Sequence, residues 1–114
     1  MSQRTKPVAA AERQQAQVFA ALGDPTRLHL VGRLSGGMPL SISQLAEGTR
    51  LTRQAVTKHL KVLEAAALVG SESHGRETRF RFIPAPVDSA SAFLAAVSRD
   101  WDAALGRLKA LVET

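Results

Sequence analysis

The chain has 114 residues, 45% of them hydrophobic and 4% aromatic, and a net charge of +5. This length predicts a single domain with an aliphatic core, and the positive charge suits a polyanionic partner. The absence of cysteine excludes disulfides and thiolate metal sites. The longest apolar run, residues 92–97, is far shorter than the roughly 18 residues of a membrane-spanning helix, so we expect a cytoplasmic protein.

The first third of the sequence predicts two helices. Residues 1–7 are polar and are expected to be a flexible tail, and apolar residues then recur at helical spacing from about Val8 until Gly23. Asp24 and Pro25 predict the start of the second helix, because aspartate is a favourable N-cap and proline is tolerated at the first helical position. The expected apolar stripe of this helix comprises Leu28, Val31 and Leu34.

Residues 41–83 predict a helix-turn-helix followed by a β-hairpin. Ser41 and Gln44 have the spacing of a capping box at the start of a third helix. Gly48 suits a turn with positive φ, and Thr52 is the expected N-cap of a fourth helix that runs to about residue 66. Two strands are expected at residues 68–73 and 78–83, around a turn at 74–77. This stretch holds seven basic and four acidic residues, a net +3 of the chain's +5.

The fourth predicted helix has one polar and one aliphatic side. About 3.6 residues per turn places Val56, Leu60 and Leu63 together, opposite the basic and polar residues. The polar side has the chemistry to read bases and phosphates in a DNA major groove, although an ordinary solvent-exposed amphipathic helix shows the same division. His59 lies at the edge of the aliphatic side, where a histidine usually makes a structural hydrogen bond.

The predicted hairpin carries arginines at and beyond its tip. Arg76 and Arg79 are placed to grip phosphates or enter a flanking minor groove, whereas Arg81 alternates with phenylalanines as an exposed strand residue does. The predicted DNA-binding set is Arg50, Thr52, Arg53, Gln54, Thr57, Lys58, Lys61, Arg76 and Arg79.

A last long helix is predicted at residues 87–112, after Pro84 and Pro86. Its apolar residues follow a spacing close to a heptad, which is typical of a helix that packs against a second copy. The alternative is that Trp101 and Leu105 cover the chain's own core. The expected order is thus α-α-α-α-β-β-α, a mainly α fold with a small hairpin, in a single domain over residues 1–114.

The sequence resembles the ArsR family of bacterial winged-helix repressors. The resemblance is carried by FAALGDPTRL at residues 19–28, ISQLA at 42–46, AVTKHLKVLE at 55–64 and ALV at 67–69. It implies a homodimer through the first and last helices, and repression by operator binding that an effector relieves. The residues assigned to this interface are Val18, Phe19, Leu94, Val97, Trp101, Leu105 and Leu108.

The residues depart from that family at its usual metal sites. Metal sensors of the family use cysteines near the positioning helix, or histidines and carboxylates on the last helix. Here residues 39–43 hold no thiol and the last helix holds no histidine. We therefore predict no metal site and no cofactor, and the sequence does not identify an effector.

These patterns favour a dimeric, sequence-specific repressor that reads an inverted-repeat operator in double-stranded DNA. The alternative is a winged-helix protein-interaction module, because a fold does not determine a function. An enzyme is not expected, since the sequence has no glycine-rich phosphate loop and its three histidines are scattered.

Overall fold

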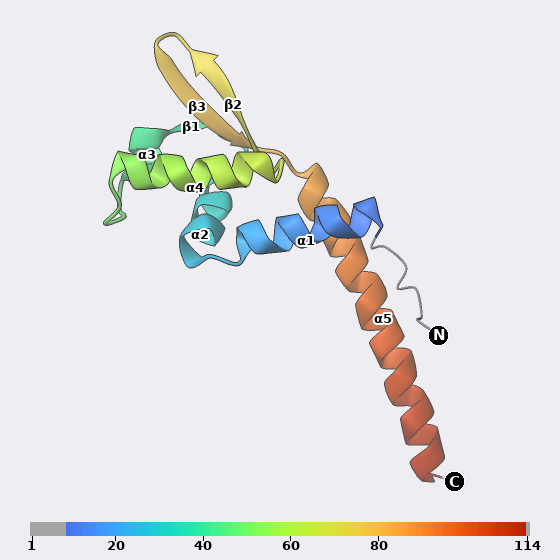
Figure 1. Ribbon diagram of the computed structural model, residues 1–114. Coiled ribbons are helices and arrows are strands. Elements are labelled where there is room, and N and C mark those ends of the chain that lie inside the picture. Colours follow the sequence, from blue (N-terminus) through green and yellow to red (C-terminus); the bar gives the residue numbers. More distant parts are fainter. Residues whose placement is uncertain (1–8, 114) are drawn as a thin grey trace, which may run out of the picture.

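The first and last helices cross near the middle of the molecule; the helix-turn-helix with its hairpin lies to one side of this crossing, and the last helix extends away on the other (Figure 1). The computed structural model describes residues 9–113, so the predicted tail at 1–7 lies outside the described residues. The crossing pair is α1 (Ala10–Leu22) and α5 (Ala85–Glu113). The other elements, in chain order, are α2 (Pro25–Leu34), β1 (Leu40–Ser41), α3 (Ile42–Ala46), α4 (Arg53–Ala65), β2 (Val69–His74) and β3 (Glu77–Phe82). The predicted mainly helical winged helix-turn-helix is confirmed.

The helix starts are where the capping residues predict them. Asp24 Oδ2 accepts hydrogen bonds from the amides of Thr26 and Arg27, at 2.9 and 3.0 Å. The Ser41 amide donates to Gln44 Oε1 at 2.8 Å, and the Gln44 amide donates back to Ser41 Oγ at 3.1 Å, which completes the capping box. Each cap provides partners for amides that the first helical turn leaves without acceptors.

The sheet has one strand more than the sequence predicts. Its order is β1-β3-β2, and all pairs are antiparallel. β1 is only two residues long, with Leu40 opposite Phe80 and Ser41 opposite Arg79. Two residues are too few to show an alternating pattern, and they become a strand because β3 presents its free edge to them.

The wing, β2 and β3 with the turn between them, is tighter than predicted. Its strands pair from Val69–Phe82 out to His74–Glu77, which leaves a two-residue turn of Gly75 and Arg76. Gly75 has a φ of 66°, the left-handed conformation that such short turns require. The predicted strand ends are therefore shifted by one residue, and His74 and Glu77 belong to the strands.

The core lies between α1, α2, α3 and α4, and the last three of these helices also contact the sheet. Leu30, Leu34, Leu45, Leu60, Leu63 and Leu68 are among its fully buried side chains. The predicted stripe of α2 was wrong at Leu28, which is 57% exposed, whereas Leu30 is 0% exposed. Leu30 is one helical turn from Leu34 and therefore shares its face, but Leu28 lies on a different side of the helix.

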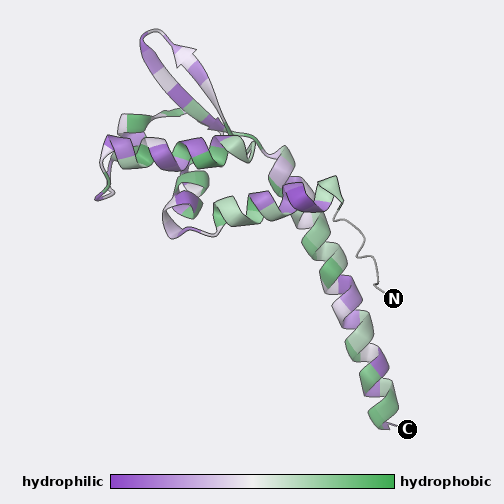
Figure 2. Ribbon diagram, in the orientation of Figure 1, coloured by the Kyte–Doolittle hydropathy of each residue, from purple (hydrophilic) through white to green (hydrophobic). Residues whose placement is uncertain are grey.

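Helix α5 begins two residues earlier than predicted and extends away from the body. It starts at Ala85, with Pro86 in its first turn, where no intrahelical hydrogen bond is lost. Figure 2 shows hydrophobic residues recurring along its length beyond the crossing with α1. In the described part of the chain, no helix is both long and apolar enough to cross a membrane.

Candidate nucleic-acid interface

Helix α4 has a polar face that is open to solvent and an aliphatic face that is buried. Val56, Leu60 and Leu63 are each 0% exposed, and they fix the helix to the core. The polar face comprises Arg53, Gln54, Thr57, Lys58 and Lys61, all of them exposed except the half-buried Thr57. The two-sided helix predicted from the sequence is confirmed, with its cationic and amide groups available to an external partner.

The two threonines predicted to bind DNA use their hydroxyl groups within the protein. Thr52 Oγ1 accepts the Ala55 amide at 3.1 Å and so caps α4. The Thr57 hydroxyl donates to the Arg53 carbonyl at 2.8 Å. Arg50 is exposed in the turn just before α4. Thr52 therefore orients the start of the helix, and the Thr57 hydroxyl proton is already engaged.

An arginine on α2 holds the short helix α3 in place. Arg33 Nη1 donates to the carbonyl oxygens of Gln44 and Leu45, at 2.8 and 3.3 Å. Carbonyls at the end of a helix lack intrahelical donors, and a cation there is favourable. The turn that follows is shaped by Thr49, whose hydroxyl donates to Ala46 O at 2.7 Å. Arg33 was not predicted from the sequence, because it belongs to no local motif.

The outer face of the wing is a row of alternating charges. Arg79 Nη2 lies 3.3 Å from Glu77 Oε2, and Arg81 Nε lies 3.7 Å from Glu72 Oε2. His74 Nε2 lies 2.9 Å from Glu72 Oε1. Of the predicted wing contacts, Arg79 is thus paired with an acid, whereas Arg76 at the turn is in none of the ion pairs between residues 9 and 113. The acidic partners follow from strand alternation and cross-strand pairing, a signal available in the sequence.

Glu77 is held in its charged form by two neighbours. The Ser41 hydroxyl donates a hydrogen bond to its carboxylate, and this interaction contributes most to a lowered pKa. The hydrogen bond and positive charge of Arg79 lower the pKa of Glu77 further. A charged carboxylate therefore stays beside the wing arginines at neutral pH.

A hollow of about 650 Å³ separates the wing from the start of the helix-turn-helix. Its lining residues are Ser41, Ile42, Ser43, Arg53, His74, Arg76, Glu77 and Thr78. Arg53 opens α4 and Arg76 tips the wing, so two predicted DNA-binding residues from separate segments border one hollow. This arrangement presents cations on two sides of a concave, polar surface, which suits a phosphate backbone.

The predicted dimer residues on α5 are exposed. Leu94, Val97, Trp101, Leu105 and Leu108, together called the α5 stripe, are between 45% and 63% exposed. Phe19 is half-buried and packs on Phe93 of α5, with ring centroids 6.3 Å apart. Val18 does not fit the prediction: it is 1% exposed, because its side of α1 faces the protomer's own core.

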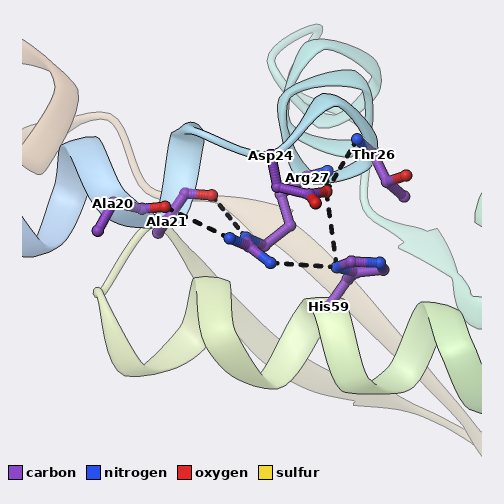
Figure 3. A network of polar contacts seen from close by, with 6 residues as sticks. All are labelled: Ala20, Ala21, Asp24, Thr26, Arg27 and His59. Atoms are coloured by element: carbon purple, nitrogen blue, oxygen red, sulfur yellow. Dashed lines mark hydrogen bonds and ion pairs between the residues drawn. The ribbon is translucent and has the colours of Figure 1, made fainter.

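A network of polar contacts joins α1, α2 and α4 beside this core (Figure 3). Arg27 Nε and Nη2 donate to the carbonyls of Ala21 and Ala20, at 2.6 and 3.3 Å. Arg27 Nη1 lies 3.4 Å from His59 Nδ1, and Asp24 Oδ2 lies 3.9 Å from the same nitrogen. The structural hydrogen bond expected for His59 is confirmed, but its partner Arg27 was not predicted from the sequence.

Asp24 is stabilised as a carboxylate within this network. The hydrogen bond from the Arg27 amide is the main reason that its pKa is lowered from the ordinary value of 3.8. The charge of Arg27 and the hydrogen bond from the Thr26 amide lower the pKa further, against partial desolvation. Among residues 9–113, the structure brings together no group of three histidine, aspartate or glutamate side chains suited to hold a metal ion.

The fold, the exposed polar face of α4 and the polar hollow between Arg53 and Arg76 define a winged helix-turn-helix DNA-binding domain. A family model described as a helix-turn-helix domain matches residues 22–71. The HTH-type transcriptional regulator Rv2034 of Mycobacterium tuberculosis is 32% identical over 102 residues, which cover 90% of this chain and 92% of that protein.

Solved structures agree with this match. An ArsR-like transcriptional regulator from Rhodococcus sp. RHA1 is 36% identical, with a TM-score of 0.78 over 90% of this chain and 96% of that one. A homodimeric winged helix-turn-helix DNA-binding domain from Mycobacterium bovis is 27% identical, with a TM-score of 0.63 over 88% of this chain and 91% of that one. The chain belongs to the ArsR family of helix-turn-helix transcriptional regulators.

Proposed function

We propose that the protein is a homodimeric repressor that reads an inverted-repeat operator. The observation that carries this proposal is the separation of two exposed surfaces, a cationic one on α4 and an apolar one on α5. The first suits a polyanion, and the second suits another protein chain. A dimer built through α5 and Phe19 presents two copies of α4 related by two-fold symmetry.

Each residue of the polar face has a role that follows from its chemistry. Arg53 suits a bidentate contact to guanine, and Gln54 suits one to adenine. Lys58 and Lys61 suit phosphates, which position the protein without reading sequence. Arg76 at the wing turn suits the phosphate backbone or the minor groove beside it. Base reading is thus assigned to the first turn of α4, and phosphate binding to the remaining cations.

The apolar surface on α5 supports the dimer. Five side chains of the α5 stripe, each at least 45% exposed, recur at spacings of three or four residues along one helix. Their burial against a second copy removes apolar area from water, the main favourable contribution to protein association. The relative from Mycobacterium bovis is itself homodimeric. Two reading helices on such a dimer match half-sites centred about 10 base pairs apart.

Repression requires only that the bound dimer occupies a promoter. A duplex covered by the dimer is closed to RNA polymerase, so DNA binding alone lowers transcription. Selection of bound duplexes from a random library, followed by footprinting upstream of the protein's own gene, tests operator reading. We expect an inverted repeat whose half-sites lie about one helical turn apart. Binding that depends on salt but is indifferent to sequence would contradict it.

A reporter assay separates repression from binding. The selected operator is placed over a constitutive promoter, and expression is compared with and without the protein. Wild-type protein should lower expression, whereas Arg53→Ala should lower it less, because a base contact is lost. An increase in expression with wild-type protein would identify an activator.

A further inference from the structure

The guanidinium of Arg27 connects α1, which carries Phe19 of the proposed dimer interface, to α4, the proposed recognition helix. The three nitrogens of Arg27 are divided between two elements: Nε and Nη2 donate to carbonyls in the last turn of α1, and Nη1 faces His59 of α4 (Figure 3). Asp24 holds the start of α2 through the amides of Thr26 and Arg27. The same carboxylate lies 3.9 Å from His59 Nδ1.

The position of His59 makes this contact informative about α4. It lies between the buried Leu60 and the exposed Lys58, at the border between the two faces of the helix. A hydrogen bond at that border resists rotation of α4 about its own axis, which the aliphatic contacts resist less because they have no direction. Rotation of α4 redirects Arg53 and Gln54 within a DNA groove.

The other end of the connection lies next to the proposed interface. Ala20 and Ala21, whose carbonyls Arg27 binds, directly follow Phe19, and Phe19 packs on Phe93 of α5. The path from the helix of the α5 stripe to the recognition helix therefore passes through one ring contact and one arginine. In a dimer formed through the α5 stripe, the angle between α4 and α5 determines how far apart the two copies of α4 lie and how they are rotated relative to each other.

We infer that Arg27 and His59 are positioning residues for operator binding, which set the half-site spacing that the dimer accepts. This inference rests on the proposed dimeric function. It requires His59 Nδ1 to be unprotonated, because Arg27 has only donors to offer and the ring nitrogen must accept. The ring proton then resides on Nε2. Asp24 and Arg27 are the charged groups that face the ring, and both come from the start of α2.

The test compares three duplexes with each protein variant. The probes are a duplex selected from a random library by wild-type protein, and the same duplex with one central base pair inserted or deleted. One base pair rotates a half-site by about 35°, so wild-type protein should lose much of its affinity for both altered duplexes. The ratio between selected and altered duplexes is the spacing penalty.

Two variants at His59 test whether an acceptor atom is needed at the position of Nδ1. His59→Leu removes the acceptor, and we expect about a tenfold loss on the selected duplex together with a smaller spacing penalty, as for a dimer that loses one hydrogen bond per protomer. His59→Asn places an amide oxygen near the position of Nδ1 and should restore both values. His29→Leu changes an exposed histidine of α2 outside this network and should behave as wild type.

Arg27→Lys provides an independent second variant. Lysine keeps the charge but has one nitrogen, which cannot reach the α1 carbonyls and His59 together as the guanidinium fork does. We expect it to reduce the spacing penalty as His59→Leu does. Thermal melting and sedimentation of every variant show whether the fold and the dimer are retained.

Failure of the proposed function and failure of the positioning role give different results. Arg53→Ala should weaken binding to all three duplexes and keep the spacing penalty; a wild-type protein that selects no duplex would refute the proposed function itself. The positioning role is refuted if His59→Leu keeps the full spacing penalty, or if its loss of affinity is uniform and His59→Asn does not reverse it. A proton on His59 Nδ1 at pH 7.5, seen in a long-range ¹H–¹⁵N spectrum of the dimer, would also refute it.

Discussion

Arg79 and Glu77 point the same way from β3, with Nη2 and Oε2 3.3 Å apart, so an acid neutralises one of the wing's cations. Glu77→Gln removes that charge and keeps a side chain that can still contact Ser41. We expect tighter binding to DNA of any sequence and a steeper loss of affinity with added salt, because more counterions are released. Fluorescence anisotropy across a potassium chloride series measures both. Glu12→Gln, the same charge change on the exposed first turn of α1, is the control, and equal behaviour of the two variants would contradict the prediction.

Gln54 and Lys61 should give opposite signatures although both lie on the polar face of α4. Gln54→Ala should reduce the preference for the selected operator over a scrambled duplex by ~1–3 kcal/mol, the loss of one bidentate base contact. Lys61→Ala should weaken binding to both duplexes alike and reduce the salt dependence. Competition binding with both duplexes, repeated across a potassium chloride series, measures the preference and the salt dependence of each variant. An unchanged preference in Gln54→Ala would remove this residue from base reading.

Trp101 is 63% exposed and lies in the middle of the α5 stripe, so a charge there tests the dimer directly. Trp101→Asp should yield a monomer in sedimentation experiments, because an unpaired carboxylate is costly to bury. Ala103→Asp places the same charge on the opposite side of α5 and should leave the dimer intact. A dimer that survives Trp101→Asp would show that the contact lies elsewhere.

The burial of one face of α4 predicts that alanine substitutions at Leu60 and Val62 lower the free energy of unfolding by very different amounts. Leu60 is 0% exposed and Val62 is 43% exposed. Leu60→Ala should lower the free energy of unfolding by ~2–5 kcal/mol, because it leaves a cavity in the core. Val62→Ala should change it by less than about 0.5 kcal/mol, as is usual for surface substitutions. Urea titrations at one protein concentration measure both values, and similar losses would contradict the burial of this face.

Asp24 makes the stability of the fold depend on acid pH. Because its pKa is lower in the folded chain than its ordinary value of 3.8, the carboxylate stabilises the fold above that value. This contribution is lost as the pH falls through the lowered pKa, where the unfolded chain binds more protons. Asp24→Asn keeps a capping oxygen without the charge. Urea midpoints measured from pH 6 to pH 2.5 should therefore fall more steeply for wild type than for the variant, and parallel slopes would contradict the assignment.

Much of the fold followed from local rules in the sequence. Ser41 and Gln44 cap α3 as their spacing requires, Asp24 caps α2, and the periodicity of α4 separates buried from exposed residues. These features depend on neighbours within one helical turn. Gly48, with a φ of 76°, is likewise where a turn between α3 and α4 needs it.

The parts that sequence reasoning missed depend on distant partners. β1 exists because β3 offers an edge, and Leu30 rather than Leu28 is buried because α2 meets the core at a particular angle. Arg27 contacts His59 across 32 positions of sequence, a pairing that no spacing rule encodes. Val18 was predicted to lie at the interface from the family resemblance, but it is buried in the protomer's own core, and helical periodicity does not show against which body an apolar residue packs.

Ser41 belongs to both halves of the proposed DNA-binding surface. It pairs with β3 as a strand residue, caps α3 with its backbone and hydroxyl, and donates to Glu77 beside the turn of the wing. At 4% exposed, it leaves little room for the wing and the helix-turn-helix to move independently. A hinged wing would lose conformational freedom when it contacts DNA. Here that loss has already occurred during folding, so the wing is preorganised and recognition needs no induced fit.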